Sequence, residues 1–479
     1  MPIVSEGYIL DSGITDQYTK ILFDDNSPLI CTLIKVELEK NSNKFYVMHA
    51  LHQVSKGYVL YSRSGKTGLQ GKISEKVFPS KEKCVASFLS TFKRMTANVW
   101  SFRDRFEHRM DHYSIFSFGE KTPDFSSAEI SESSTSDTFN SIDELLDLLC
   151  GEKTTKAAIC SLGLDEKKLP IGMVTSRNIG LAREVLSQLQ EAILEKAPEE
   201  KIIKLCNHFY GFIPLRSAGK LPILSSDESI SKKFEELEDL ENITRTLQIL
   251  EKGDSSISNL GYSMNHSIKP ILCDDPMYQL IENYMKNSHG TTHHFHLKLL
   301  SIYEVRNEKK YEVFNKKYGK SSRRELLIHG SRLCNWRSIL ERGLQINPST
   351  LSDRITGKMF GHGIYWANSF SKSAQYCPVA RGQKEKICLA LAEVAVGNQL
   401  RLTNGNHTLS SSNIKGYDSV LGIGQKTPSG YTPMSDGTMI PTGKLTASAV
   451  PGSNLFYDET IIYDPDQYHF RYLVIAQIN

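Results

Sequence analysis

The sequence predicts a multidomain α+β protein with a small α+β domain, an all-α bundle and a mainly antiparallel sheet domain. Its 479 residues are enough for about three domains of roughly 100 to 200 residues each. Between residues 142 and 253, apolar residues recur at helical spacing. From Pro276 to the end, β-branched and aromatic stretches broken by glycine and proline predict long strands.

The composition is typical of a soluble globular protein, with 39% hydrophobic and 23% charged residues. No apolar run reaches the length of a membrane span, and the first residues lack the pattern of a secretory signal. We therefore expect an intracellular protein. The nine cysteines are scattered, without a C-x-x-C pair or a histidine at ligand spacing. This predicts reduced thiols and no structural zinc, which excludes zinc-finger DNA binding by this chain.

Charge is segregated along the chain, although the formal net charge is only +3. Residues 41–110 carry 13 lysines and arginines against 4 acidic residues, a net charge of +9. Residues 120–150 carry one lysine against eight acidic residues, a net charge of −7. A basic module is thus followed directly by an acidic segment, and clustered basic charge is typical of nucleic-acid contact.

Residues 1–118 are expected to form the small α+β domain. Alternating apolar residues predict strands at Lys44–Leu51 and Gly57–Gly68. A helix is predicted from Ser80 to Met95, because Ser80 is a good N-cap and apolar residues follow it at helical spacing. Strands followed by one amphipathic helix are typical of an α+β domain.

Two further segments precede the C-terminal sheet. Residues 119–141 are acidic, rich in serine and poor in large apolar residues, so they predict a flexible linker. Residues 142–262 are predicted to form the all-α bundle. Its apolar residues fall into three segments: Ile179, Val185, Leu186 and Leu189; Ile202, Ile203, Leu205 and Phe209; and Phe234, Leu237, Leu240 and Leu247.

Four motifs follow one another in residues 263–479. They read LLIHGSR at 326–332, GKMFGHGIYWAN at 357–368, SKSAQYC at 371–377 and YDETIIYD at 457–464. In this order they resemble the NAD-binding and catalytic core of the poly(ADP-ribose) polymerases. The resemblance implies an ADP-ribosyltransferase fold for residues 263–479, with NAD as the substrate and no metal. It also implies transfer of ADP-ribose to protein acceptors, including the chain itself.

These motifs contain the candidate site residues. His329 follows an apolar run at a predicted strand end, and Gly330 lets a ligand approach the backbone. Glu459 shares one strand face with Ile461, while Asp458 faces the other way, so Glu459 can point into a cleft. The resemblance implies a catalytic triad of His329, Tyr365 and Glu459. It further implies that NAD is contacted by Gly330, Ser331, Asn335, Ser373 and Tyr376. The acceptor side is expected to lie near Met359 and Lys372.

The resemblance implies that Glu459 decides the kind of product. ADP-ribosyl transfer separates nicotinamide from its ribose and leaves positive charge on the sugar, which one nearby carboxylate can stabilise. By resemblance, Glu459 does this and polarises the attacking hydroxyl. The complete triad implies chain elongation rather than transfer of a single unit. The simpler interpretation, an acid at a strand edge in water, fits Asp458 and Asp464 better.

The basic domain resembles the WGR domain of the DNA-break-dependent members of this family. Where that domain has Trp-Gly-Arg, this chain has Ser-Gly-Lys at residues 64–66, so the large indole is missing. DNA ends or nicks remain the expected partners. Their phosphates are expected to meet Arg63, Lys66, Lys72 and Lys76. The alternative is a solvated basic face on a protein-interaction module.

The helical segment resembles the family's regulatory domain at Lys168–Val174 and His208–Pro214. This implies that the helices hinder access of NAD until DNA is bound, so that the chain is autoinhibited. Two residues near the site depart from the family pattern. Gln345 stands where a basic residue commonly faces the adenosine, and His362 stands where a lysine is common. These changes predict altered NAD binding and an acceptor step that depends on pH.

The function predicted from the sequence is a NAD-dependent poly(ADP-ribose) polymerase that is stimulated by DNA breaks, linked to DNA repair and located in the nucleus. Three alternatives stay open: a mono(ADP-ribosyl)transferase, a non-catalytic nucleic-acid-binding scaffold, and hydrolysis of NAD without a protein acceptor. The sequence is also compatible with an accessory factor that completes the site, and it leaves the acceptor side chain open.

Overall fold

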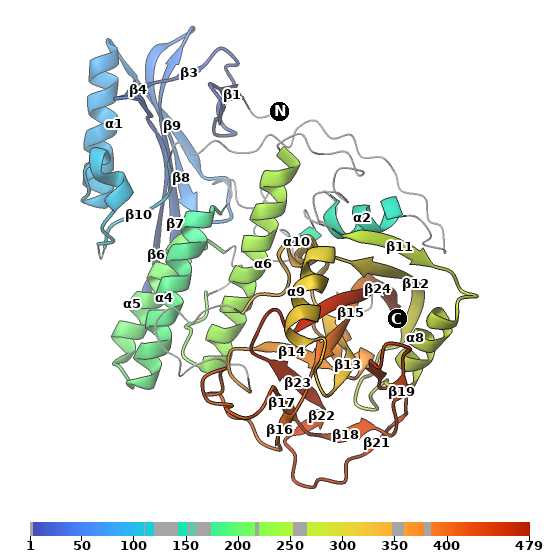
Figure 1. The fold of residues 1–479 in the computed structure, drawn as a ribbon. Helices are drawn as coiled ribbons and strands as arrows, with labels where there is room; N and C mark the ends of the chain where they lie inside the picture. The colour runs from blue at the N-terminus through green and yellow to red at the C-terminus, as the bar shows by residue number, and fades with distance from the viewer. Residues whose placement is uncertain are drawn as a thin grey trace. The chain divides into compact units, whose positions relative to one another are not determined.

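The computed structural model describes residues 3–109, 111–118, 142–151, 154, 157–158, 174–215, 220–251, 266–346, 359–377 and 385–479 (Figure 1). The predicted linker at 119–141 and residues 168–173 of the regulatory motif lie outside these ranges. The chain divides into two compact units. The first unit consists of Met1–Ser131 and Lys156–Glu251, and the second of Glu132–Thr155 and Lys252–Asn479.

The first unit contains an antiparallel sheet in the order β10-β6-β7-β8-β9, with β3 also paired to β7. The predicted strands at Lys44–Leu51 and Gly57–Gly68 are confirmed as the hairpin of β7 and β8, which pairs Gln53 with Gly57 beside its turn. The strands are β3 (Lys20–Ile21), β6 (Ile30–Glu37), β7 (Ser42–Gln53), β8 (Gly57–Lys66), β9 (Lys72–Phe78) and β10 (Ser114–Phe118). Two short pairs lie outside this sheet: β1 (Val4–Ser5) with β2 (Tyr8–Ile9), and β4 (Phe23–Asp24) with β5 (Ser27–Pro28).

Helix α1 (Lys81–Thr96) covers one face of this sheet. The predicted N-cap is confirmed, because the side chain of Ser80 accepts a hydrogen bond from the backbone N–H of Lys83 at 3.4 Å. Phe88 and Phe92 are fully buried in a core that includes Leu33 of β6 and Trp100 of the 3₁₀ turn Trp100–Arg105. The apolar face of the helix therefore packs on the sheet, as its spacing predicts.

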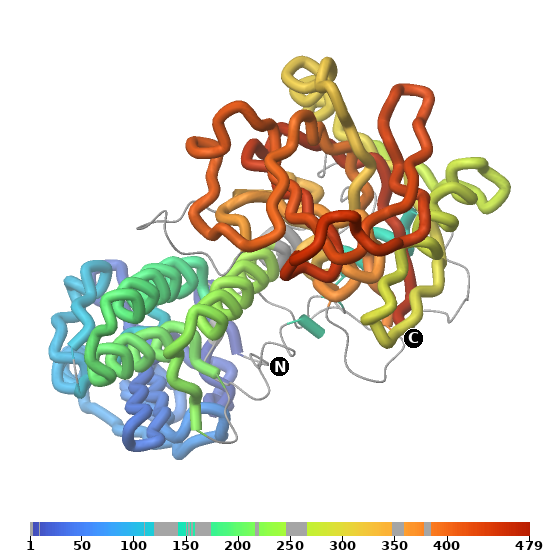
Figure 2. Tube along the Cα trace, turned by 90° about the horizontal axis from the view of Figure 1, so that it is seen from below, coloured from blue at the N-terminus to red at the C-terminus, as the bar shows by residue number. Residues whose placement is uncertain are grey.

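The opposite face of the same sheet is covered by helices α4 (Ser176–Leu194), α5 (Glu199–Phe212) and α6 (Asp227–Glu251). Leu186 and Phe209 pack with Ile34 of β6 in one core, and α4 and α5 run side by side (Figure 2). The amide of Asn178 in α4 donates to the carbonyl of Phe116 in β10 at 3.0 Å. Leu33 and Ile34 are adjacent, so they face α1 and the three helices respectively. These helices thus share a core with the basic sheet.

The second unit contains an 11-stranded sheet whose main order is β11-β12-β24-β15-β13-β14-β23-β17-β16, with β19 and β20 beside β13. The predicted mainly antiparallel sheet is confirmed, since only β16–β17 and β13–β20 pair in parallel within it. Its strands are β11 (Ser267–Ile271), β12 (Leu297–Arg306), β13 (Arg324–Gly330), β14 (Ile364–Ala367), β15 (Glu385–Ala395), β16 (Gln399–Leu402), β17 (Ser419–Gly422), β19 (Thr432–Pro433), β20 (Met439–Ile440), β23 (Glu459–Ile462) and β24 (Tyr468–Ile478).

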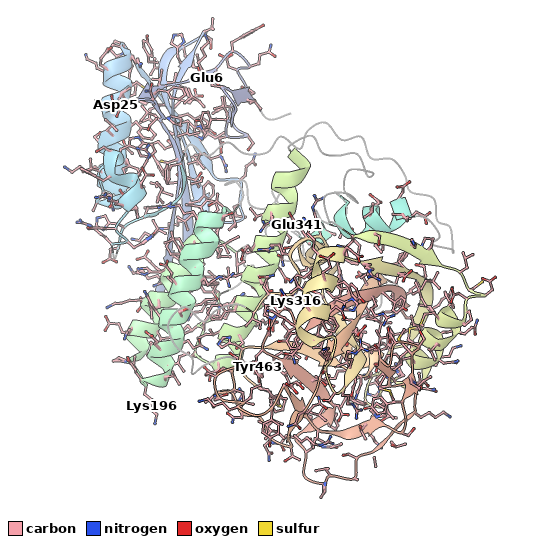
Figure 3. All side chains as sticks on the ribbon, in the orientation of Figure 1. Glu6, Asp25, Lys196, Lys316, Glu341 and Tyr463 are labelled. Atoms are coloured by element: carbon pink, nitrogen blue, oxygen red, sulfur yellow. The ribbon has the colours of Figure 1, made fainter. Side chains whose placement is uncertain are left out.

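A smaller sheet in the order β21-β18-β22 accompanies the large one. Its strands are β18 (Gly424–Pro428), β21 (Leu445–Ala447) and β22 (Leu455–Tyr457). The helices described in the part of this unit that carries the sheets are α8 (Pro276–Asn287), α9 (Glu308–Tyr318), α10 (Trp336–Arg342) and α11 (Phe370–Ala374). Lys316 of α9 and Tyr463, which follows β23, are labelled in Figure 3.

Helix α2 (Ile142–Cys150) belongs to the second unit, although it lies in the segment predicted to form the helical bundle. Its buried residues Leu145, Leu146 and Leu149 pack in the core that contains Trp336 and Val305. The predicted helical segment is therefore divided: α2 completes the core of the large sheet, whereas α4, α5 and α6 complete that of the basic sheet. Periodicity identifies an apolar helix face but not the surface that will cover it.

Three properties concern the described residues alone. The cysteines at positions 31, 84, 206, 273, 334, 377 and 388 are free thiols. No group of three or more His, Cys, Asp or Glu side chains in these ranges is arranged to hold a metal ion. None of the described helices has both the length and the apolar character that a membrane crossing requires.

We predict that His49 makes the first unit less stable in mild acid. His49 lies on β7 against Tyr61, with ring centroids 5.9 Å apart, and its Nδ1 has no hydrogen-bond partner among the described residues. Burial lowers its pKa to about 4, whereas an unfolded histidine titrates near about 6.5. Between these values the unfolded chain binds the additional proton, so stability falls as pH decreases. The full shift corresponds to on the order of 3 kcal/mol.

The variant His49→Phe keeps an aromatic ring at this position and removes the titrating group. Scanning calorimetry of the full chain at about pH 4.5 and about pH 7 should show a smaller acid-induced loss in Tm for the first unit of the variant. His108, whose pKa burial also lowers to about 4, is retained and accounts for a residual pH dependence. An identical pH dependence in both proteins would contradict the prediction.

Candidate active site

His329 and Gly330 are the last two residues of strand β13. At this strand end the motif at 326–332 meets the motif at 371–377. Nδ1 of His329 donates to the carbonyl of Tyr365 at 3.1 Å, and its ring packs against Trp366. A side chain at position 330 would collide with the backbone carbonyl of Ser373. Gly330 therefore lets β13 pack closely against α11, which places these two motifs together.

The residues predicted to contact NAD surround this strand end. The hydroxyl of Ser373 in α11 donates to the carbonyl of Ile328 at 3.2 Å, and the amide of Asn335 donates to the hydroxyl of Ser331 at 3.1 Å. Tyr376 follows α11 and is 58% exposed, so its ring presents a face for stacking. Ser369 caps α11 by accepting from the backbone N–H of Lys372, which orients this short helix.

Tyr365 lies on β14, between β13 and β23. Its hydroxyl donates to the carbonyl of Gly361 and accepts from the backbone N–H of Phe360, both at 2.9 Å. Gly361 has φ +73°, a conformation that side chains rarely adopt, so a glycine is needed at this position of the loop before β14. Burial raises the pKa of the Tyr365 hydroxyl, which keeps it protonated as a donor.

Glu459 begins β23, where it is paired with Ala367 of β14 and Gly422 of β17. The strand pairing therefore brings the second and fourth motifs side by side. Glu459 is only 9% exposed, and its Oε1 lies 2.9 Å from Nζ of Lys372. A buried carboxylate requires such a partner, because burial without one is costly.

Lys372 is predicted to lie on the acceptor side, and the structure places it 8% exposed behind Glu459. Its Nζ also donates to the carbonyls of Tyr457 and Asp458, at 2.9 and 3.2 Å. Burial lowers the pKa of Lys372, while the charge of Glu459 opposes the shift. The ammonium thus ties α11 to the chain segment that carries Glu459, a connection that the sequence pattern does not indicate.

The interpretation of Asp458 as a solvated acid is wrong. Asp458 is 4% exposed and accepts hydrogen bonds from Gly424 N and Thr427 Oγ1 at 2.7 Å and from Asn368 Nδ2 at 3.0 Å. It connects β22, β18 and the end of β14. A carboxylate that receives three donors is a structural element, and alternation along the chain could not distinguish it from an exposed acid.

Two other predicted positions have local contacts. Met359 is half-buried, and its carbonyl accepts from the backbone N–H of Asn406 at 2.8 Å. Gln345 is exposed, and its amide donates to the carbonyls of Arg342 and Gly343. These bonds close the end of α10 rather than extend toward a ligand.

The four basic residues expected to contact phosphates differ in exposure. The expectation that Arg63 meets a phosphate is corrected, because its side chain is buried. Arg63 is 2% exposed and forms a two-pronged ion pair with Asp11, with Nη2 2.6 Å from Oδ2. It also donates to the carbonyl of Gln70 and packs over the ring of Phe45. Arg63 therefore anchors the N-terminal segment. Lys66, Lys72 and Lys76 are exposed, so they can reach a phosphate.

We predict that Asp458→Ala destabilises the second unit by on the order of 3 kcal/mol or more, because two buried donors and one partly buried donor lose their acceptor. Asp466→Ala is the control: it removes a partly exposed ion pair with Lys317, and such pairs contribute about 1 kcal/mol or less. Scanning calorimetry should show a clearly larger loss in Tm for Asp458→Ala. Equal losses in the two variants would refute the structural role.

Three family descriptions match successive parts of the chain. Residues 276–478 match the poly(ADP-ribose) polymerase catalytic domain, and residues 138–267 match the poly(ADP-ribose) polymerase regulatory domain. Residues 30–107 match the WGR domain. The three matches follow the order of the resemblances found in the motifs.

Several curated proteins are similar over almost the whole chain. Poly [ADP-ribose] polymerase 1 of Gallus gallus is 30% identical over 98% of this chain and 47% of its own length. Poly [ADP-ribose] polymerase 2-A of Oryza sativa is 30% identical over 94% of this chain and 70% of its own length. The Homo sapiens poly [ADP-ribose] polymerase 2 is 28% identical over 93% and 79%.

This chain thus spans about half the length of the relatives from Gallus gallus and Xenopus laevis, and about 70% of the relatives from Oryza sativa and Zea mays. The three matched segments and the 30% identity to the rice protein, which the chain covers over 70% of its length, identify the family. The chain belongs to the poly(ADP-ribose) polymerase family.

Proposed function

We propose that this protein is a NAD-dependent poly(ADP-ribose) polymerase that modifies protein acceptors, including itself, and elongates the attached chain. The observation that carries this proposal is the position of Glu459. It is buried, ion-paired to Lys372 and held on β23, the strand next to the one that carries Tyr365. A carboxylate held in this way lies at a defined place, which stabilisation of a cationic transition state requires.

The residues around the end of β13 suit NAD. NAD supplies the ADP-ribose that is transferred and nicotinamide as the leaving group. Tyr376 offers an exposed ring for stacking on a flat aromatic amide, and Ser373 and Gly330 lie together for polar contacts with it. His329 is oriented through its Nδ1 bond to Tyr365, and its ring is proposed to contact a sugar hydroxyl of NAD. Ser331 and Asn335 complete this set of contacts.

Glu459 has two tasks in the proposed reaction. The bond between the ribose carbon and nicotinamide breaks with its electron pair leaving on nicotinamide, and the carboxylate offsets the positive charge that develops on the sugar. An acceptor oxygen then forms the new bond and passes its proton toward Glu459. Lys372 holds Oε1, whereas Oε2 has no hydrogen-bond or ion-pair partner among the described residues. Oε2 is therefore the atom proposed to accept from the acceptor hydroxyl.

We further propose that DNA ends or nicks stimulate this activity through the first unit, in the nucleus and in connection with DNA repair. Exposed Lys66, Lys72 and Lys76 on and beside the edge strand β9 supply the phosphate contacts. The sheet that bears them shares its core with α4, α5 and α6. DNA contact would thus act directly on the helices proposed to hinder access of NAD. An accessory factor that completes the acceptor side is compatible with this arrangement.

The proposed chemistry predicts the behaviour of Glu459→Gln. This variant keeps the side-chain shape but loses the charge and the proton acceptor, so polymer elongation should fall by at least about 100-fold. NAD binding should persist, because the residues near β13 are unchanged. Labelled NAD, gel analysis of product length and calorimetric titration of NAD measure the two effects. Glu312→Gln on exposed α9 is the control. Unchanged polymer length in Glu459→Gln would remove Glu459 from the reaction.

The proposed DNA contact predicts a defined salt effect. The double variant Lys72→Gln, Lys76→Gln should bind nicked or blunt DNA more weakly, and the slope of log affinity against log salt should decrease by about 2. DNA-stimulated activity should fall in parallel. The control removes two exposed lysines of α9, Lys309→Gln and Lys316→Gln (Figure 3). Fluorescence anisotropy with labelled DNA measures both pairs, and an equal response of the two pairs would contradict the assignment of β9.

A further inference from the structure

A pocket in the second unit is lined by residues other than those assigned to NAD. It has a volume of about 250 Å³ and is formed where the end of α8 meets the small sheet β21-β18-β22. Three lysines and Tyr457 contribute to its lining. None of the residues assigned to NAD is among those that line it. The lysines are Lys286, Lys426 and Lys444.

The fold brings these lysines together from distant parts of the chain. Lys286 lies in the last turn of α8, Lys426 lies on β18 beside Tyr457 of β22 in parallel register, and Lys444 directly precedes β21. Asn287 donates to the carbonyl of Thr442 at 2.8 Å, which fixes α8 against the loop before β21. The cluster is therefore held by backbone pairing and by this bond, rather than by chance surface proximity.

The pocket carries excess positive charge. Glu282 pairs with Lys286 at 3.0 Å, one helical turn away. Neither Lys426 nor Lys444 has an ion-pair partner among the described residues. Like charges that converge without carboxylates repel each other, and a bound anion relieves this repulsion. His289 also lines the pocket and adds a further polar ring. The chemistry favours a ligand with two or more negative charges, because lysines bind phosphate groups as point charges.

Tyr457 connects this pocket to the catalytic carboxylate. Its hydroxyl is bonded to Oγ1 and N of Thr292, at 2.8 and 3.1 Å, which holds its ring at the pocket. Its carbonyl accepts from Lys372, the ammonium that is paired with Glu459. Tyr457 is two residues before Glu459. The pocket thus lies beside the chain segment that presents Glu459, whereas the NAD-binding residues surround the end of β13.

We propose that this pocket binds the pyrophosphate group of an ADP-ribose unit in the growing chain, beyond the unit that reacts at Glu459. This inference rests on the proposed polymerase function and adds a polymer-holding subsite to it. A volume of about 250 Å³ is smaller than most sites that enclose a whole ligand. It suits a diphosphate with part of its sugar, and the rest of the polymer extends into solvent. Retention of the chain here keeps its end near Glu459 for the next transfer.

Direct binding tests the site without catalysis. Fluorescence anisotropy of a labelled ADP-ribose oligomer with the full chain, in the absence of NAD, should give about 10-fold weaker affinity for Lys426→Gln, Lys444→Gln. Wild-type binding should weaken with salt. Lys309→Gln, Lys316→Gln is the matched control and should bind as wild type does. Equal affinity of the two double variants for the oligomer would overturn the proposal.

Product length provides the second readout. At matched NAD consumption, the Lys426 and Lys444 variant should make chains several-fold shorter than the α9 control makes. The single variant Lys444→Gln, at an exposed position, protects the test against misfolding and should shift length in the same direction. Unchanged chain length would overturn the role in elongation.

Two further outcomes distinguish this proposal from a nucleic-acid site and from a failure of the proposed polymerase function. If duplex DNA displaces the oligomer and loses affinity with the same substitutions, the pocket is a nucleic-acid phosphate site and the proposal fails. If the wild type binds the oligomer through these lysines but makes no polymer from NAD with or without DNA, the subsite stands and the proposed polymerase function fails.

Discussion

The buried ion pair between Lys372 and Glu459 is the interaction on which the second unit's site depends. Removing two charges from water is costly, and the cost is offset only when the remaining hydrogen-bonding capacity is also satisfied. Lys372 meets this condition, because its ammonium also reaches the carbonyls of Tyr457 and Asp458. Loss of either partner would leave an uncompensated buried charge, at about 3–5 kcal/mol. The pair thus joins α11 to β23 and holds the carboxylate of Glu459 in place.

The division of the helical segment has consequences for regulation. Helix α2 completes the core of the large sheet, and α4, α5 and α6 complete the core of the basic sheet. Each residue of a strand faces one side of the sheet only. In β6, Leu33 therefore packs on the side of α1, and Ile34 packs on the side of α4, α5 and α6. In the proposed regulation, a ligand of the basic sheet would act on the sheet and its helices together, since close-packed cores transmit displacement. In the proposed regulation, DNA sensing and gating therefore reside in the same unit.

Much of the fold followed from local patterns. The helix that begins after Ser80, the β7–β8 hairpin and the long antiparallel strands of the second unit were predictable, because capping residues and apolar periodicity act within a few residues. The roles of Arg63 and Asp458 were not. Arg63 lies in a basic segment, yet Asp11, more than fifty positions earlier, buries it in an ion pair. Asp458 receives its donors from β18 and from beyond β14. The spacing of residues along the chain does not indicate the partners of Arg63 or of Asp458.

The sequence by itself determined the family and the order of the motifs, and it proposed His329, Tyr365 and Glu459 as candidate site residues, since these depend on residue types at short range. Tertiary structure alone decided which charges are buried in pairs and which stay exposed to a ligand. It placed Lys372 behind Glu459, and it gathered Lys286, Lys426 and Lys444 around one pocket. The physical reason is that electrostatic partners are set by distance through space, which strand order and helix packing establish and chain spacing does not.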